Sequence, residues 1–432
     1  MYEVVRELIG GEEIPLFADV RYDIQTVQVP DVQKAVLDAL AGEALLERIL
    51  PGERVAITAG SRQIANIVTI LRTVVDAVKG RGAKPYIVAA MGSHGGATDE
   101  GQRVVLAGYG ITEAAMGCDV VSHMETVNIG KSADGHDVCI DAFAAGCDKI
   151  IVVGRVKSHT DFHGPVESGL AKMIAIGLGK QHGAELCHKL GFPAMSHNVV
   201  QFAHVALEKL PFAFGVAIVE DAFHHTAQIS GVAAERFEAD EPALLEQAKA
   251  LMPCIPFDKI DILIVDEIGK NISGAGMDPN ITGRSPRLGI GRPYAQRIVV
   301  LDIANASHGA GTGIGNADAI TRRAYQKYDF DVTYANGITS NDPESIRIPA
   351  VMPSDKTAIQ FALNTLMGAD RNHVRIVWIR NTGDLSHIRI SEGLVAEARM
   401  HARLTLEGQA RAVQFDENGN LPYLDPEPDT HG

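Results

Sequence analysis

Histidine and lysine side chains are concentrated in one stretch of the chain, from Gly154 to His188. The stretch contains four histidines and three lysines, namely His159, His163, His182, His188, Lys157, Lys172 and Lys180. Histidine carries protons near neutral pH and is the most common imidazole ligand of metals. These residue types indicate acid–base chemistry, metal binding, or both.

The spacing of the histidines disfavours a compact metal site built from histidine alone. His182 and His188 are six residues apart, whereas two ligands on one helical face are three or four residues apart. A metal that takes one histidine from the protein and its other ligands from a cofactor fits this spacing better.

Lys172 lies in the apolar segment SGLAKMIAIGLG. An apolar setting disfavours the ammonium form, which lowers the pKa of the lysine and makes its amine a nucleophile. The structural alternative is a lysine whose ammonium group reaches the solvent.

Two further motifs carry side chains that suit a bound ligand. In MGSHGGAT, His94 stands in a glycine-flanked turn, where an imidazole is exposed as a general acid or base must be. In AGSR, a serine hydroxyl, free helix N–H groups and Arg62 together suit a phosphate. The alternatives are a turn histidine bonded to the backbone and an ordinary helix N-cap at Ser61.

Two other motifs have structural explanations at least as good as a functional one. His224 and His225 follow Asp221, and HGAGTGIGN from His308 is a glycine-rich loop of the kind that binds anions. The sequence has neither a GxxxxGK[ST] motif nor a GxSxG motif, which disfavours a nucleoside triphosphate site and an α/β-hydrolase.

Short apolar segments precede most of these motifs. They are continuous rather than alternating, which is typical of parallel strands covered on both faces. They begin at Arg54, Lys84, Lys149, Pro211, Ile260, Arg297 and Val374. Because helix-like segments lie between several of them, we predict an α/β protein.

Two prolines between residues 251 and 257 interrupt a helical pattern before a new strand begins. We predict two α/β domains with largely parallel sheets, an N-terminal domain of residues 1–253 and a C-terminal domain of residues 254–432. Ligands bind beyond the carboxyl ends of such strands, and the active site is expected in the cleft between the domains. The polar tail from residue 416 is predicted to be a loose terminus.

Composition limits the classes of function. A net charge of −15 disfavours broad binding of nucleic acids or anionic membranes. The five cysteines are scattered without a C-x-x-C pair, which disfavours a disulfide framework or a thiolate zinc site. With neither a signal peptide nor an apolar run long enough to span a membrane, a reducing cytoplasm is the expected compartment.

The order of the motifs resembles that of the nickel-pincer lactate racemase family. An arginine loop, a G-x-H turn, a histidine at a strand end, an SGxxK motif and a later histidine read here as AGSR, MGSHGG, KSH, ESGLAKM and ELCH. Lys172 and His188 are 16 residues apart, as expected of the family. The resemblance covers most of the chain and is clearest between Arg54 and His188.

The resemblance implies a nickel-pincer nucleotide cofactor, pyridinium-3-thioamide-5-thiocarboxylic acid mononucleotide with nickel held by sulfur, carbon and sulfur. It implies that Lys172 tethers this cofactor covalently and that His188 is the protein ligand of the nickel. The other implied roles are cofactor binding by Arg62, Ser168 and Gly169, acid–base catalysis by His94 and His159, and substrate binding by Lys270 and Glu267.

The activity that the resemblance implies is racemisation or epimerisation of a 2-hydroxy acid, from lactate or malate to larger sugar acids. One histidine takes the hydroxyl proton while a hydride leaves the α-carbon and later returns to its opposite face. Two bases are needed, because one imidazole cannot reach both faces of a fixed carbon. The implied partners are the 2-hydroxy acid and the enzymes that make the cofactor, and assembly into an oligomer stays open.

Departures from the family pattern make a divergent homologue the expectation. AGSRQ replaces an acidic DxTRP-type loop, and Glu267 replaces a glutamine. The spacing between His159 and Lys172 admits His163 as a rival for the second base, and replacement of an assigned histidine by His182 also stays open. Two alternatives stay open. One is a metal-dependent hydrolase or lyase that uses His159, His163 and His188 with Asp161, and the other is a non-catalytic protein that binds a phosphate ligand.

Overall fold

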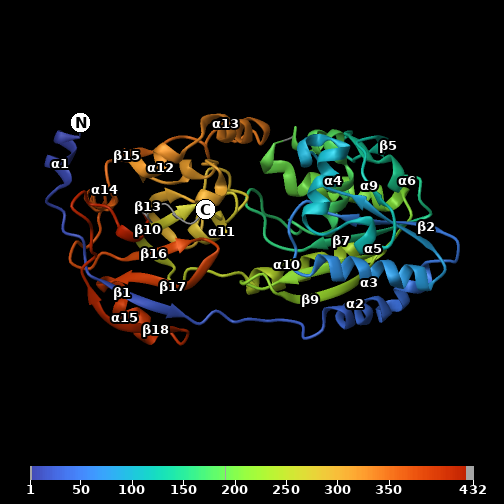
Figure 1. Cartoon of the computed structure of the whole chain (residues 1–432), viewed down its shortest axis with the longest axis horizontal. Helices are drawn as coiled ribbons and strands as arrows, with labels where there is room; N and C mark the ends of the chain where they lie inside the picture. Colours follow the sequence, from blue (N-terminus) through green and yellow to red (C-terminus); the bar gives the residue numbers. More distant parts are fainter. Residues whose placement is uncertain (1, 190, 425–432) are drawn as a thin grey trace. The chain divides into compact units, whose positions relative to one another are not determined.

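The computed structural model describes residues 2–189 and 191–424, which divide into two compact units (Figure 1). Unit 1 consists of Met1–Ile24 and Pro253–Gly432, and unit 2 consists of Gln25–Met252. The sequence placed residues 1–253 in one domain. Residues 1–24 belong instead to unit 1, because strand β1 (Phe17–Tyr22) pairs with two strands of that unit.

Unit 2 contains a six-stranded sheet in the order β4-β3-β2-β7-β8-β9. All neighbours in it are parallel except β8 and β9. In chain order the strands are β2 (Arg54–Ala59), β3 (Lys84–Ala89), β4 (Val120–Val121), β7 (Lys149–Arg155), β8 (Phe212–Glu220) and β9 (Thr226–Ala233). A separate antiparallel pair consists of β5 (Thr126–Lys131) and β6 (Asp137–Asp141).

Apolar layers cover both faces of this sheet. Within β2, Ala56 belongs to one apolar cluster, whereas Val55 and Ile57 belong to another. Burial on both faces explains why the strands read as continuous apolar runs. The helices of unit 2 are α2 (Val32–Ala41), α3 (Ile67–Gly80), α4 (Asp99–Gly108), α5 (Glu113–Met116), α6 (Ala142–Ala145), α7 (Leu170–Lys172), the π-helix η3 (Met173–Leu178), α8 (Lys180–His188), α9 (Met195–Lys209) and α10 (Phe237–Leu251).

Unit 1 contains an eight-stranded mixed sheet in the order β15-β14-β13-β10-β16-β17-β1-β18. The first five strands are parallel, and the remaining pairings are antiparallel. These strands are β10 (Lys259–Ile268), β13 (Tyr294–Ile303), β14 (Ala319–Thr321), β15 (Ala350–Met352), β16 (Ile376–Asn381), β17 (Asp384–Ser391) and β18 (Leu404–Arg411), together with β1. The predicted α/β class with largely parallel sheets is therefore confirmed.

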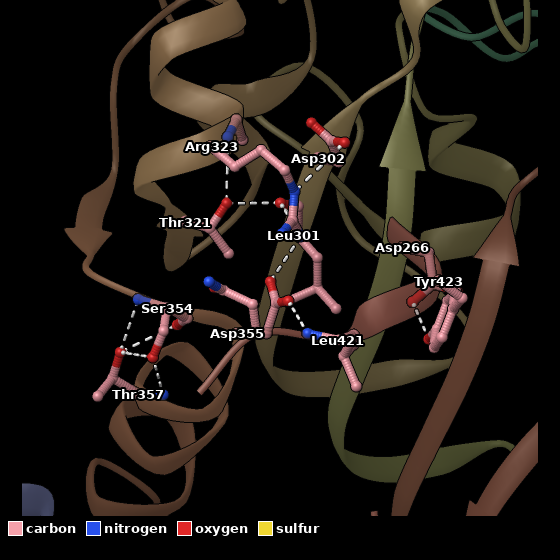
Figure 2. A network of polar contacts seen from close by, with 12 residues as sticks. Asp266, Leu301, Asp302, Thr321, Arg323, Ser354, Asp355, Thr357, Leu421 and Tyr423 are labelled. Atoms are coloured by element: carbon pink, nitrogen blue, oxygen red, sulfur yellow. Dashed lines mark hydrogen bonds and ion pairs between the residues drawn. The ribbon is translucent and has the colours of Figure 1, made fainter. Parts of the chain in front are cut away.

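In unit 1, the first turn of α12 (Arg322–Lys327) links a strand of the sheet to a neighbouring helix. Arg323 of this helix lies 3.4 Å from a carboxylate oxygen of Asp302 and donates to Asp355 at 2.7 Å (Figure 2). It thereby ties the end of β13 to the start of α14. The helices are α1 (Glu3–Ile9), α11 (Pro279–Thr282), α12 (Arg322–Lys327), α13 (Phe330–Thr339), α14 (Asp355–Asn364) and α15 (Glu392–Met400). No helix in the described part of the chain has the length and apolar character needed to cross a membrane.

The residues after β18 pack against unit 1 (Figure 2). Leu421 is buried, and its N–H donates to Asp355 at 2.7 Å. The Tyr423 hydroxyl donates to Asp266 at 3.2 Å. The predicted loose terminus is therefore wrong as far as Leu424, and the rest of the tail lies outside the described residues.

Candidate functional site

The AGSR and MGSHGG motifs follow neighbouring strands of unit 2. Ala59 and Ala89, the last residues of β2 and β3, pair in parallel register, so the two loops leave the sheet side by side. The Ser61 hydroxyl is hydrogen-bonded to Nδ1 of His94, whose side chain is exposed. Arg62, next to Ser61, is also exposed. The structure therefore brings the predicted phosphate loop and the predicted catalytic turn together.

His159 lies in the loop after β7, and its ring is held from two directions. The side chain is 15% exposed, and the ring stacks on Phe162 with 4.2 Å between ring centroids. Its Nδ1 accepts a hydrogen bond from the backbone N–H of Asp161 at 3.0 Å. In the neutral ring the proton therefore belongs on Nε2.

Three cationic side chains act on His159, and the carboxylate of Asp161 lies 3.7 Å from its Nδ1. Burial, followed by the charges of Lys172, Lys157 and Arg62, holds the pKa of His159 well below its ordinary value, and His188 acts in the same direction. The interaction between two charges falls with the distance between them. The predicted site residues of unit 2 that act on His159 therefore lie in one region.

Lys172 ends α7, directly before the π-helix η3. Its ammonium group lies 5.7 Å from the centroid of the Phe162 ring. Burial, with smaller effects of Arg62 and Lys157 in the same direction and Asp161 opposing them, lowers the pKa of Lys172 to about 8. The apolar setting thus has the effect on this amine that the sequence predicted, and π-helical turns are often found at functional sites.

His188 is the last residue of α8. Its Nδ1 lies 2.6 Å from the carbonyl oxygen of Ala184. A carbonyl only accepts, so Nδ1 is the donor and Nε2 carries the lone pair, which is the form that a metal-binding histidine takes. Among the described residues, no three histidine, cysteine, aspartate or glutamate side chains are grouped closely enough to hold a metal ion.

Glu167, which the sequence analysis did not single out, organises the loop that carries His159. It is fully buried and accepts hydrogen bonds from Ser158 at 3.0 Å, from the His159 N–H at 2.7 Å and from the His163 ring at 3.1 Å. Burial would raise its pKa, but these donors together with Lys249 hold it below the ordinary value. His163, the rival base, is thus engaged by Glu167.

Ser168 and Gly169 have structural partners. The backbone of Ser168 exchanges hydrogen bonds of 3.0 and 3.1 Å with Lys157. A Cβ on Gly169 would lie 1.9 Å from Oε1 of Glu241, whose other oxygen accepts from the Ala171 N–H at 2.9 Å. Burial raises the pKa of Glu241 to about 7. Glu241 therefore occupies the space beside Gly169 at the start of the Lys172 helix, and it lies too far along the sequence to be found from the motif.

The predicted substrate residues lie in unit 1, at and after the end of β10. Lys270 donates from Nζ to the Gly274 carbonyl at 2.8 Å, and its backbone N–H donates to Ser307 at 3.0 Å. Glu267 accepts a hydrogen bond of 3.2 Å from Asn381. Both residues thus occupy the edge of the sheet where α/β proteins bind ligands.

The motif around Asp221 is explained by its local structure. Asp221 accepts hydrogen bonds from the backbone N–H groups of Phe223 at 2.9 Å and His225 at 2.8 Å. These bonds close the turn between β8 and β9. The structural explanation therefore accounts for Asp221 and His225.

Comparisons with known proteins agree with this architecture. Residues 17–198 match the lactate racemase N-terminal domain, and a search of curated proteins found no match. The lactate racemase apoprotein from Thermoanaerobacterium thermosaccharolyticum is similar at 12% identity over 78% of this chain and 98% of that one, with a TM-score of 0.49. A Thermotoga maritima protein is similar at 12% identity over 83% and 99%, with a TM-score of 0.50, which shows a shared fold. Residues 17–198 are thus similar to the lactate racemase N-terminal domain.

Proposed function

We propose that the chain is a racemase or epimerase of a 2-hydroxy acid and works with a nickel-pincer nucleotide attached to Lys172. One observation supports this most strongly. The pKa of Lys172 is lowered to about 8. Lys172, Arg62 and His188 all lower the pKa of His159. An attachment amine, a metal ligand and a phosphate-binding cation are the three groups that this cofactor requires from a protein.

The residues of unit 2 fit this cofactor. Lys172 would supply the amine, because a lowered pKa leaves part of it unprotonated and nucleophilic near neutral pH. His188 would supply Nε2 to the nickel, since its Nδ1 faces a backbone carbonyl. Arg62 is exposed beside Ser61 and would bind the phosphate. When bound, the cofactor supplies reversible hydride transfer with the α-carbon of the substrate.

His94 and His159 are the proposed proton-handling pair. In the described tautomer, His159 holds its proton on Nε2 and presents an N–H donor, which would hydrogen-bond to the oxygen on the reacting carbon; to take a proton at Nε2, the ring would have to change tautomer and give up the Asp161 contact. His94 is exposed with Nδ1 bonded to Ser61, a bond that orients its ring for proton exchange. Lys270 is the proposed ligand of the substrate carboxylate, with Glu267 nearby in the sequence.

The proposal is tested by producing the chain together with the enzymes that make the cofactor. Intact-protein mass spectrometry and nickel analysis are then followed by chiral analysis of a panel of 2-hydroxy acids. We expect a mass increment on Lys172, near-stoichiometric nickel and loss of enantiomeric purity with one substrate class. Lys172→Ala should lose the increment and the nickel, His188→Ala should lose mainly the nickel, and Lys84→Arg, at an exposed lysine, should lose neither.

An unmodified, nickel-free protein beside a family member that loads normally would overturn the proposal. The zinc or iron hydrolase alternative requires a cluster of ligands, which the described residues do not form.

A further inference from the structure

Lys180 is a completely buried lysine at the junction between η3 and α8. Its relative exposure is 0%, and its backbone is left-handed with φ of 53°, which is strained for a residue other than glycine. Lysines are almost never fully buried unless they are paired. The burial of its side chain and the strain of its backbone indicate that Lys180 is held in place by specific contacts.

Three groups surround the ammonium group of Lys180. Nζ donates to the Ala89 carbonyl at 2.5 Å, lies 3.1 Å from a carboxylate oxygen of Asp141 and donates to Oε1 of Gln102 at 3.3 Å. Asp141 and Gln102 are also 0% exposed. The ion pair with Asp141 compensates the buried charge of Lys180. The hydrogen bond to Gln102 is an additional contact, which links Lys180 to another part of the unit.

Gln102 connects Lys180 to the turn that carries His94. Its Nε2 donates to the Gly92 carbonyl at 2.9 Å and to the His94 carbonyl at 3.3 Å. Because an ammonium group only donates and carbonyls only accept, the amide can be oriented in one way only. The Gln102 amide therefore accepts a hydrogen bond from Lys180 through its oxygen and donates to the His94 turn through its nitrogen.

The backbone of the turn also touches η3 directly. The N–H of Gly92 donates to the Gly177 carbonyl at 3.2 Å, and a Cβ on Gly92, whose φ is 58°, would lie 3.2 Å from the Ile176 carbonyl oxygen. The turn itself is rich in glycines with positive φ, including Gly95 and Gly96. Such a backbone has little stiffness of its own and depends on external contacts.

We propose that Gln102 and Lys180 are positioning residues that fix the His94 turn against the helical segment carrying Lys172 and His188. Lys180 lies eight residues after Lys172 and eight before His188. The inference rests on the proposed function for the role of His94, whereas the fixing of the turn does not depend on it.

The test compares Gln102→Met with Gln181→Met, because Gln181 is an exposed glutamine on α8. The first measurement is amide hydrogen exchange of the cofactor-free protein. In Gln102→Met we expect exchange in residues 92–97 to accelerate on the order of tenfold, with the circular dichroism spectrum and exchange in β2 unchanged. In the loaded enzyme we expect kcat to fall by about 10- to 100-fold with KM little changed, because the error is one of geometry.

Exchange in the turn that stays the same as in Gln181→Met would overturn the proposal. If Gln102→Met fails to fold, Gln102→Glu replaces it, because the carboxylate keeps an acceptor for Lys180 and sets an oxygen against the two carbonyl oxygens of the turn in place of the donor. Faster exchange in the turn, combined with a wild-type protein that racemises no 2-hydroxy acid, would support the positioning role and refute the proposed function.

Discussion

The lowered pKa of Lys172 makes a quantitative prediction about its reactivity. At about pH 7.5, an amine with a pKa of about 8 is about 24% unprotonated, whereas one with the ordinary value of 10.5 is about 0.1% unprotonated. The concentration of the nucleophilic form is therefore about 200-fold higher. Lower intrinsic nucleophilicity and partial burial reduce this advantage without changing the pH at which reactivity levels off.

Competitive labelling with trace acetic anhydride between about pH 6 and about pH 11 measures this midpoint by mass spectrometry. We expect the labelling of Lys172 to level off above about pH 8, while that of the exposed Lys84 continues to rise. A Lys172 that follows Lys84 throughout would refute the reasoning from burial.

Two substitutions test the electrostatic part of the shift in opposite directions. The Asp161 carboxylate raises the pKa of Lys172, and the Arg62 guanidinium lowers it. Asp161→Asn should therefore move the labelling midpoint down, and Arg62→Gln should move it up. Asp38→Asn, at an exposed position of α2, is the matched control. Shifts of the same sign in both variants would contradict this account.

Three further predictions concern the surroundings of Lys172. Lys172→Met should raise the pKa of His159, because it removes a positive charge that lowers it; NMR titration of the ring protons measures this, and an unchanged pKa would contradict it. The same variant should be more stable than the wild type below about pH 8, by at most about 3 kcal/mol, and should lose this advantage by about pH 10.5, since the folded state disfavours the ammonium form; melting curves at both ends of this range decide it. Gly169→Ala should destabilise the protein by about 1–3 kcal/mol, because the Cβ would collide with Glu241, whereas Gly108→Ala, which meets nothing within 4 Å, should not; urea unfolding compares the two.

The sequence allowed the α/β class to be predicted because burial on both faces leaves continuous apolar strands. It did not reveal that β1 belongs to unit 1. That strand lies between β17 and β18 in antiparallel register, and such pairing between the first and last parts of a chain leaves no local pattern. A domain boundary drawn from proline positions alone therefore misses residues 1–24.

The buried polar residues of the site were also beyond reach of the sequence. Glu167, Gln102 and Lys180 are fully buried, yet in a sequence these residue types usually indicate the surface. Glu241 contacts Ala171, which is 70 residues away. The candidate catalytic residues directly follow apolar strands, so the sequence reveals them. The residues that position them are not revealed, because they contact side chains and backbone groups from other helices and strands.

The charges around His159 connect the two chemical roles assigned to this region. Lys172, Lys157 and Arg62 all disfavour a second proton on the His159 ring, in addition to the effect of burial. Conversion of the Lys172 amine to a thioamide would remove one of these charges, and an anion bound at Arg62 would offset another. Each of these two changes by itself acts to raise the pKa of His159, whereas burial and the cationic groups of the cofactor act to lower it. The unmodified chain thus keeps this imidazole neutral, and attachment of a group to Lys172 changes the charge next to it, so modification of the lysine and protonation of the histidine are coupled through the electrostatics of the site.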